Sequence, residues 1–323
     1  MKRQLASAKR ALPRVGRAAS AAVMTEPTPA RPSGLPMALG AYTIWGLLPL
    51  YLMLVRQVPP IEFVGWRIIF TLPLCALFIV VRRQWPDLRT ALTTPAVMLR
   101  LGISAALVGI NWLIYIAAIQ QGHVFAASLG YYINPLVNVL AGTLFLGEKL
   151  SRRQWAAVAL AAAGVSLLAW DARDMLWISL SLAVSFSAYG LVRKTTPVGS
   201  VPGLTIESLL LLLPAIGIVA WYAGQPAGTA FGRDLSSSLL IALSGVVTAV
   251  PLVMFAIAAR RMDYSTLGFV QYIAPTMVFL LGLFVFGEPL SQTKLACFVA
   301  IWCAIALFVW DLLARRVSAK PPA

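Results

Sequence analysis

Long apolar runs separated by short polar segments make up most of the chain. Ten of these runs have about 17–23 residues, the length that a helix needs to cross a hydrocarbon core of about 30 Å. The runs do not alternate residue by residue, as the strands of a transmembrane barrel do. Because backbone polar groups in lipid must be paired within the spanning segment, helices are expected. The pattern therefore predicts an all-α polytopic membrane protein with ten transmembrane helices, at about residues 36–55, 60–81, 97–119, 124–146, 154–170, 175–193, 203–223, 237–259, 264–286 and 292–313.

The composition supports the same class. Of the 323 residues, 60% are hydrophobic and only 11% are charged, whereas a soluble domain has about 25% charged residues. The mean hydropathy is +0.83. The fifth run, 154–170, is short and rich in small residues, so we expect it to pack among other helices or to use its ends to reach both interfaces.

The second half of the chain repeats the first at a spacing of 140 residues. Between 132–171 and 272–311, thirteen of forty positions are identical without a gap. The matches include a proline and the pairs Gly-Glu, Leu-Ser and Trp-Asp, all in register, which apolar bias alone does not produce. We therefore expect two homologous five-helix repeats at 36–171 and 174–313, with a disordered basic tail at 1–35 and a second cytoplasmic tail at 314–323.

Lysine and arginine gather on one side of the predicted helices. If residue 1 is cytoplasmic, 21 of the 26 basic residues fall in cytoplasmic segments, four fall in outer segments and Arg67 lies inside a span. This positive-inside distribution predicts that both termini are cytoplasmic. The net charge of +15 is then explained by contact with anionic membrane lipids, so nucleic acid is not an expected partner.

An odd number of spans in each repeat places the two repeats in opposite orientations. The loop GEKLSRR at 147–153 is then cytoplasmic, whereas its counterpart GEPLSQTK at 287–294 faces outward. The change from Lys149 to Pro289 follows the charge that each side of the membrane favours. Inverted repeats are typical of secondary transporters with alternating access, whose substrate site lies near the midplane where the repeats meet.

Charged side chains within apolar runs are costly and are therefore candidates for function. Arg67 in the second span and Glu207 in the seventh are 140 residues apart, so they occupy corresponding positions in the two repeats. They can pair with each other, or bind the two ends of a zwitterion; alternatively, each reaches its own headgroup region. Glu62 lies in the first turn of the second span, where a carboxylate is also favoured by the helix dipole.

The fourth and ninth spans carry the related motifs YYINP and QYIAP. A proline inside a helix removes one hydrogen bond and frees a carbonyl group, and such groups at membrane depth face protein or a watery cavity. We predict that these turns line a central cavity; the alternative is that the prolines only shape the bundle. The predicted residues are Tyr131, Tyr132, Asn134, Gln271 and Tyr272, with helix kinks at Pro135 and Pro275.

Polar and aromatic residues in the other spans are further candidates for the transport pathway. Asn111 and Tyr115 in the third span are four positions apart and therefore share a helix face. The alternative for each candidate is helix–helix contact or ordinary packing. The candidates are Asn111, Trp112 and Tyr115 in the third span, Trp45 in the first and Tyr189 in the sixth, with a hinge at Pro49.

Several kinds of chemistry have no motif in the chain. There is no GxxxxGK[ST] phosphate loop, no HExxH motif and no GxSxG motif. The single histidine, His123, lies in a predicted outer loop, and the three cysteines fall in apolar runs. We therefore expect no catalytic residues, no metal site and no cofactor, and the chain is not expected to be an enzyme.

The motifs resemble those of the EamA group of the drug/metabolite transporter superfamily, and within it those of the RarD subfamily. The resemblance extends over about 36–312 and rests on AYTIWGLLPLY, RQWP, the NW of the third span, ASLGYYINPLVNVLAGTLFLGE, SFSAYGLVRK, the IES of the seventh span and STLGFVQYIAPT. One position departs from the subfamily, in which a histidine tends to precede the arginine of the second span. Here Trp66 occupies that position, which puts a proton-linked role for that histidine in doubt.

The resemblance implies a permease of the bacterial inner membrane that exports small metabolites or drugs. The expected partners are an amino-acid-like or drug-like solute and membrane lipids, with protons as a candidate coupling ion. Two other functions stay open at this point. One is a membrane receptor or scaffold without transport, and the other is a membrane-embedded lipid-modifying enzyme.

Overall fold

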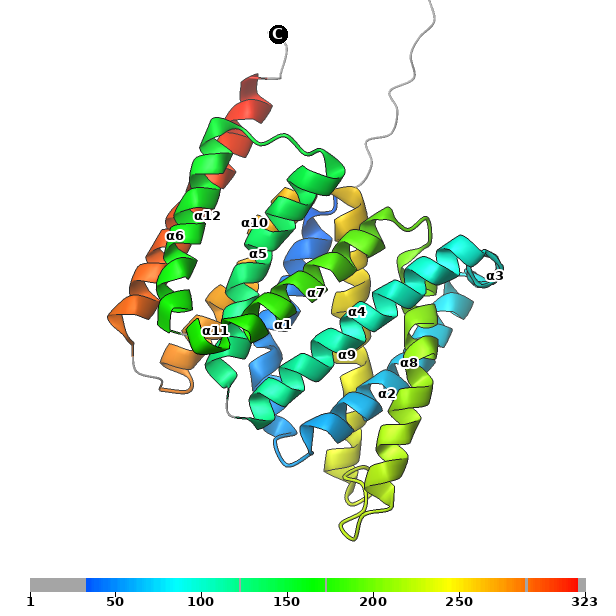
Figure 1. The fold of residues 1–323 in the computed structure, drawn as a ribbon. Helices are drawn as coiled ribbons and strands as arrows, with labels where there is room; N and C mark the ends of the chain where they lie inside the picture. The colour runs from blue at the N-terminus through cyan, green and yellow to red at the C-terminus, as the bar shows by residue number, and fades with distance from the viewer. Residues whose placement is uncertain (1–32, 122, 172, 288–289, 319–323) are drawn as a thin grey trace, which may run out of the picture. The chain divides into compact units, whose positions relative to one another are not determined.

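The structure, a computed structural model, describes residues 33–121, 123–171, 173–287 and 290–318. The regular secondary structure of these residues is helical (Figure 1). The helices are α1 (Leu35–Leu54), α2 (Pro60–Val81), α3 (Trp85–Thr93), α4 (Pro95–Gln120), α5 (Val124–Leu146), α6 (Arg152–Asp171), the 3₁₀ helix η1 (Arg173–Met175), α7 (Leu176–Thr195), α8 (Ser200–Ala223), α9 (Leu235–Arg261), α10 (Tyr264–Gln271), α11 (Ile273–Phe284) and α12 (Gln292–Ser318).

Nine helical segments among the described residues are long and apolar enough to cross a membrane. One of them joins α10 and α11, over Tyr264–Phe284. The predicted fifth span coincides with α6, which is a helix but is not among the nine. Its alanine-rich sequence and the two arginines at its start make it the least apolar of the candidate spans. The all-helical prediction is confirmed, and the tenth span stays a prediction.

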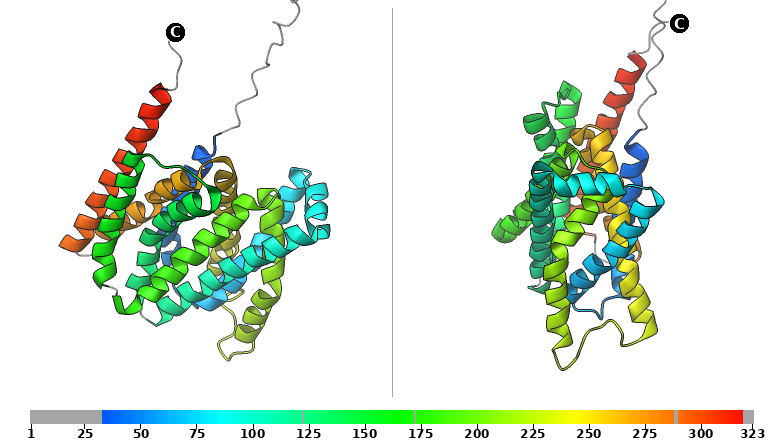
Figure 2. Two further views of the ribbon diagram at one scale, coloured as in Figure 1. Left: turned by 45° about the horizontal axis from the view of Figure 1, so that its top comes forward. Right: turned by 90° about the vertical axis from the view of Figure 1, so that its right-hand side faces the viewer.

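Helix α6 packs along α12 at one edge of the bundle, while α2 packs on α8 elsewhere in it (Figures 1 and 2). Gly164 allows α6 to approach α12 closely. A Cβ atom at this position would lie 2.8 Å from Ala300 Cβ and 3.1 Å from the carbonyl oxygen of Cys297. Without side-chain bulk at Gly164, the two helices bury a shared apolar seam, including Ala157, Ala161 and Ile301.

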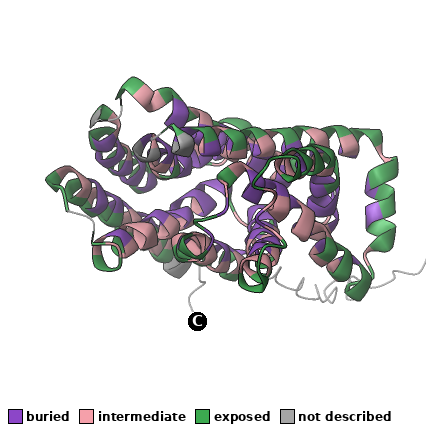
Figure 3. Cartoon of the chain, turned by 90° about the horizontal axis from the view of Figure 1, so that it is seen from below, coloured by how far each residue is buried: buried purple, intermediate pink, exposed green. Residues whose placement is uncertain are grey.

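The remaining large contacts form between helices from different predicted repeats. Helix α4 packs on α7 and α8, α9 packs on α1 and α2, and α5 packs on α7 and α10. Buried residues face the interior of this arrangement, whereas exposed apolar residues such as Leu213 and Phe284 lie outside (Figure 3). The apolar outer surface is what a helix bundle solvated by lipid requires.

Polar side chains fix several helix ends on the side where α5 ends. Glu148 accepts hydrogen bonds from the backbone N–H groups of Tyr264 (2.6 Å) and Ser265 (2.8 Å) at the start of α10. A carboxylate is favoured at this place because unpaired N–H groups and the helix dipole meet there. Lys194 donates to the carbonyl oxygens of Ala259 (2.9 Å) and Met262 (2.6 Å) at the end of α9. The Gly-Glu motif of the first repeat therefore holds a helix of the second, whereas residues 288–289 of the second copy lie outside the described residues.

The two proline motifs differ in structure. Helix α5 runs without interruption through Pro135, and α1 likewise contains Pro49. The second copy is broken at Tyr272 into α10 and α11, with Pro275 in the first turn of α11. Proline is tolerated in a first turn because its missing N–H group has no helical partner there. The same motif thus gives a continuous helix in one repeat and a break in the other.

Both predicted tails lie largely outside the described residues. Of the segment 1–35, residues 1–32 are not described, and Leu35 already belongs to α1. At the other end, α12 continues to Ser318, so the first part of the predicted tail 314–323 is helical.

Replacing Gly164 by valine should weaken the contact between α6 and α12. The added side chain overlaps Ala300, and overpacking of this kind costs about 1–3 kcal/mol. We expect a lower midpoint of thermal unfolding for the purified protein in detergent. Gly217→Val is the matched control, because a Cβ atom at Gly217 meets nothing within 4 Å and the change in helix propensity is the same. Equal midpoints for the two variants would contradict the close packing at Gly164.

Candidate functional site

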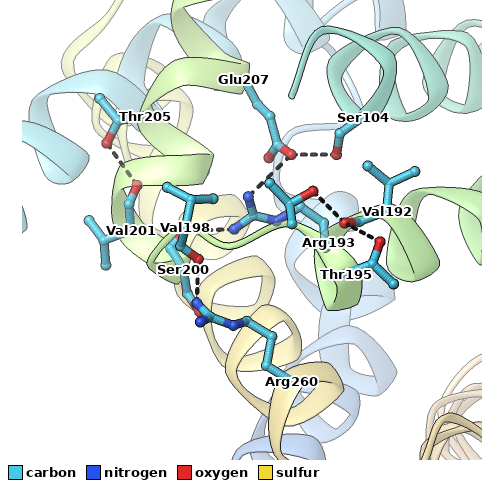
Figure 4. Close-up of polar contacts among 11 residues, drawn as sticks. Ser104, Val192, Arg193, Thr195, Val198, Ser200, Val201, Thr205, Glu207 and Arg260 are labelled. Carbon is cyan, nitrogen blue, oxygen red and sulfur yellow. Dashed lines mark hydrogen bonds and ion pairs between the residues drawn. The ribbon is translucent and has the colours of Figure 1, made fainter. Parts of the chain in front are cut away.

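The carboxylate of Glu207 lies within the bundle and is shared by three helices. Its side chain on α8 is 2% exposed. Oε1 accepts a hydrogen bond from Ser104 Oγ of α4 at 2.5 Å and forms an ion pair with Arg193 Nη1 of α7 at 3.5 Å (Figure 4). A buried carboxylate is tolerated only where hydrogen bonds and an opposite charge compensate the loss of water.

Arg193 is the functional candidate that the sequence pattern missed. It was counted with the cytoplasmic charges, but its side chain is 2% exposed at the last turn of α7. Nη2 donates to the carbonyl oxygen of Ser200 at 2.9 Å, while Nη1 faces Glu207. A signal was present, because Arg193 follows Tyr189 by four residues and therefore shares its helix face.

A glycine on α8 makes room for this ion pair. A Cβ atom at Gly203 would overlap the guanidinium group of Arg193. Gly203 precedes Glu207 by four residues, so the two positions lie on one face of α8, one above the other. The arginine therefore reaches Glu207 across a backbone that carries no side chain.

Arg67, which corresponds to Glu207 in the first repeat, has different partners. Its Nε donates to Thr248 Oγ1 of α9 at 3.0 Å, and its guanidinium carbon lies 4.6 Å from the centre of the Trp112 ring. Tyr51, Tyr115 and Tyr131 are close enough to interact electrostatically with it. Glu207 pairs with Arg193 and not with Arg67, so the predicted direct pairing is replaced, and joint binding of a zwitterion stays a prediction.

A small cavity connects the surroundings of the two charges. Glu207 and Tyr189 line one part of it, and the two contact partners of Arg67, Trp112 and Thr248, line another. Its other lining residues are Ile68, Thr71, Val108, Leu204, Ser208, Leu211 and Leu252. The space holds about one water molecule, so the cavity is nearly closed in this conformation.

Comparisons with known proteins decide the family. The EamA-like transporter family matches residues 32–170. The chain is 42% identical to protein RarD of Escherichia coli, over 88% of this chain and 97% of that protein. It is 41% identical to an uncharacterized transporter of Pseudomonas aeruginosa, over 86% of this chain and 93% of that protein. The chain belongs to the RarD-like branch of the EamA-like transporter family.

Membership of this family indicates that the RarD-like chain is a membrane transporter rather than an enzyme. A transporter of this family implies a small-molecule substrate. Together with the nine apolar helices, this membership indicates a multi-pass protein of the bacterial inner membrane. A solved crystal structure shares the fold with a TM-score of 0.68 at 20% sequence identity, covering 88% of this chain and 98% of the other.

Two residues that were predicted to line a central cavity, Asn134 and Gln271, form a buried amide network in this conformation. Gln271 Nε2 donates to Asn134 Oδ1 at 2.5 Å, and Asn138 Nδ2 donates to Gln271 Oε1 at 2.7 Å. Asn134 Nδ2 also donates to the carbonyl oxygen of Ala183 on α7 at 2.6 Å. The network joins α5, α7 and α10, so in this conformation these amides hold helices of the two predicted repeats together.

The three tyrosines of the same motifs lie in different surroundings. Tyr272 is fully buried in the core near α6 and α12. Tyr132 packs edge-to-face on Phe298, with 5.4 Å between ring centres. Tyr131 is 52% exposed and lies 6.1 Å from Tyr115 between ring centres. Of the three, Tyr131 is close enough to Arg67 to interact electrostatically with it.

Asn111 and Trp45 contact other helices directly. Asn111 Nδ2 donates to the carbonyl oxygen of Leu182 and to Ser185 Oγ, both at 2.9 Å, and so ties α4 to α7. Trp45 packs among aromatic rings, 5.7 Å from Phe186 and 5.8 Å from Phe255. These contacts agree with the alternative that Asn111 and Trp45 serve helix packing. Tyr189 and Trp112, by contrast, line the cavity.

Glu62 anchors the loop between α8 and α9. Its Oε1 accepts hydrogen bonds from the backbone N–H group of Ala230 at 2.7 Å and from Trp66 Nε1 at 3.0 Å. The Trp66 ring in turn lies 4.7 Å from that of Phe231. Glu62 therefore ties the start of α2 to this loop. No group of three His, Cys, Asp or Glu side chains within the described ranges is arranged to hold a metal ion.

Gly203→Ala should displace the Arg193 guanidinium group and weaken its ion pair with Glu207. Complete loss of one partner of a buried ion pair lowers the free energy of unfolding by about 3–5 kcal/mol. Because Gly203→Ala displaces the arginine without removing it, we expect a smaller loss of about 1–3 kcal/mol. The measurement is the thermal unfolding midpoint of the purified protein. Gly217→Ala on the same helix is the control, since its Cβ atom meets nothing within 4 Å. If Gly203→Ala were as stable as the control, the close approach of Arg193 to α8 would be wrong.

Proposed function

We propose that this RarD-like chain exports a small metabolite or drug-like solute by alternating access. The cavity between Glu207 and the partners of Arg67 is the observation that carries the proposal. It is lined from α2, α4, α7, α8 and α9, and therefore from both predicted repeats. A small cavity between corresponding helices, with a carboxylate in its wall, fits the midplane substrate site of such a transporter.

The packing supports an inverted arrangement of 36–171 and 174–313. In the predicted repeats, α1 corresponds to α7, α2 to α8 and α4 to α9. The contact of α4 with α7 therefore has a counterpart in the contact of α9 with α1. The contact of α2 with α9 likewise has a counterpart in the contact of α8 with α4. Each repeat thus offers corresponding helices to the other. In the proposed cycle, the two repeats rock about the central cavity and expose it to one side of the membrane at a time.

A proton carried by Glu207 is the coupling step that the geometry favours. The carboxyl group lies next to Tyr189, and its Oε2 is buried without a hydrogen bond of standard geometry among the described residues, so we infer that this oxygen takes up the proton. Binding would release Arg193 from its ion pair, and Ser104 can hydrogen-bond to either form of the carboxyl group. Protonation would then change how strongly α7 is held to α8.

The proposed topology places Lys149 in the cytoplasm and Ser291 outside. In a variant whose three natural cysteines are replaced, Lys149→Cys and Ser291→Cys should react with a membrane-impermeant maleimide from opposite sides. Both positions are exposed, so access is limited by the membrane alone. In intact spheroplasts, only the cysteine at 291 should be labelled. Labelling of both cysteines from one side would disprove the inverted arrangement.

Overexpression should enrich the culture medium in at least one small solute relative to a deletion strain, as measured by mass spectrometry. Glu207→Gln should abolish this enrichment or make it independent of external pH, because the amide carries no transferable proton. Asp87→Asn in the exposed part of α3 is the matched control and should behave as the wild type. Thermal unfolding of both variants checks that they are folded. Unchanged export and unchanged pH dependence in a folded Glu207→Gln protein would remove Glu207 from the mechanism.

A further inference from the structure

Arg67 retains hydrogen-bonding capacity that the protein does not use. Its guanidinium group has five N–H donors in a planar fork, and the Nε donor binds Thr248. For the four donors on Nη1 and Nη2, the described residues provide no hydrogen-bond acceptor. The side chain is half-buried rather than fully buried, so a ligand can reach it without displacing a packed core residue.

The charge of Arg67 is also without a carboxylate partner in the described structure. The residues that interact with it come from α1, α4, α5 and α9, and none of these helices contains an aspartate or glutamate. The acid on its own helix, Glu62, is five residues away and accepts from Ala230 and Trp66. Glu207 is paired with Arg193. One uncompensated positive charge therefore remains beside the cavity.

We propose that Arg67 binds a carboxylate group of the transported solute, which is therefore a small organic anion. This inference rests on the proposed transport function and specifies its substrate class. Two parallel N–H donors of a guanidinium group match the two oxygens of a carboxylate. An anion also supplies the charge that an arginine within a membrane protein needs.

The surroundings of Arg67 define the rest of the ligand. The guanidinium carbon of Arg67 lies 4.6 Å from the centre of the Trp112 ring, and its Nη1 and Nη2 donors are the groups that would bind the carboxylate. Tyr115 and Tyr131 stand next to it with their rings 6.1 Å apart, and they offer both aromatic faces and hydroxyl groups. The site suits a solute with a carboxylate at one end and a flat or apolar body. Because Arg193 neutralises Glu207, a positively charged amine on the solute has no free acidic partner there.

Ligand-induced thermal stabilisation of the purified wild-type protein tests this assignment. The probes are carboxylates with aromatic, aliphatic and hydroxylated bodies, such as phenylacetate, hexanoate and 4-hydroxyphenylacetate, each compared with its neutral amide and with the amine of similar size. A ligand that binds the folded state stabilises it by RT ln(1 + L/Kd), where L is the free ligand concentration, so the unfolding midpoint rises with ligand concentration and with affinity. At least one carboxylate should raise the midpoint, whereas its amide and amine should bind at least tenfold more weakly.

The arginine variants separate a specific site from a general effect of charge. Arg67→Gln should weaken binding of that carboxylate at least tenfold, whereas Arg67→Lys should recover part of it because a single charge remains without the fork. Arg56→Gln, at an exposed position, should bind as the wild type does. The inference is overturned if no carboxylate binds, if the amides or amines bind equally well, or if Arg67→Gln binds normally. Export of a neutral or cationic solute by the wild type would leave the transport function standing while overturning the anionic substrate.

Discussion

The compensation of charge inside an apolar bundle is the constraint on which the rest of this structure depends. A helix surrounded by lipid cannot leave a carboxylate or a guanidinium group without partners, because water is not there to solvate it. Glu207 meets this requirement with Ser104 and Arg193, and these contacts draw α4, α7 and α8 together. Gly203 is a glycine for the same reason, since a side chain there would occupy the place of the arginine. The path of the helices near the cavity is thus set by one polar cluster.

The two predicted repeats compensate their buried charges with different partners at corresponding positions. Glu207 has an internal counter-charge, whereas Arg67 has an aromatic ring and a hydroxyl group. Likewise, Asn134 and Asn138 correspond to Ala274 and Val278, so only the first repeat supplies the asparagines that bind Gln271. The two predicted repeats therefore differ in their buried polar side chains, even at positions that correspond in sequence.

The sequence alone predicts much of this organisation, because hydropathy reports directly on contact with lipid. Apolar runs mark the helices, and a charge such as Arg67 or Glu207 stands out within them. Arg193 was missed because it precedes Lys194 at a helix end, where basic residues ordinarily face the cytoplasm; only the packing of α8 shows that it is buried. The proline motifs show a similar limit. Pro135 and Pro275 both follow a Tyr-Ile pair, yet α5 is continuous whereas the second copy is broken at Tyr272. The role of Asn134 likewise depends on its partners rather than on its position.

The contact of Glu148 with α10 has a mechanical consequence. Two charge-assisted hydrogen bonds join the loop after α5 to the first N–H groups of an eight-residue helix, and each bond of this kind is worth about 1.5–3 kcal/mol. The same helix is held at its other end by the hydrogen bonds of Gln271 with Asn134 and Asn138, so α10 is fixed at both of its ends to α5 or the loop that follows it. A movement of α10 away from the end of α5 must therefore break both hydrogen bonds to Glu148.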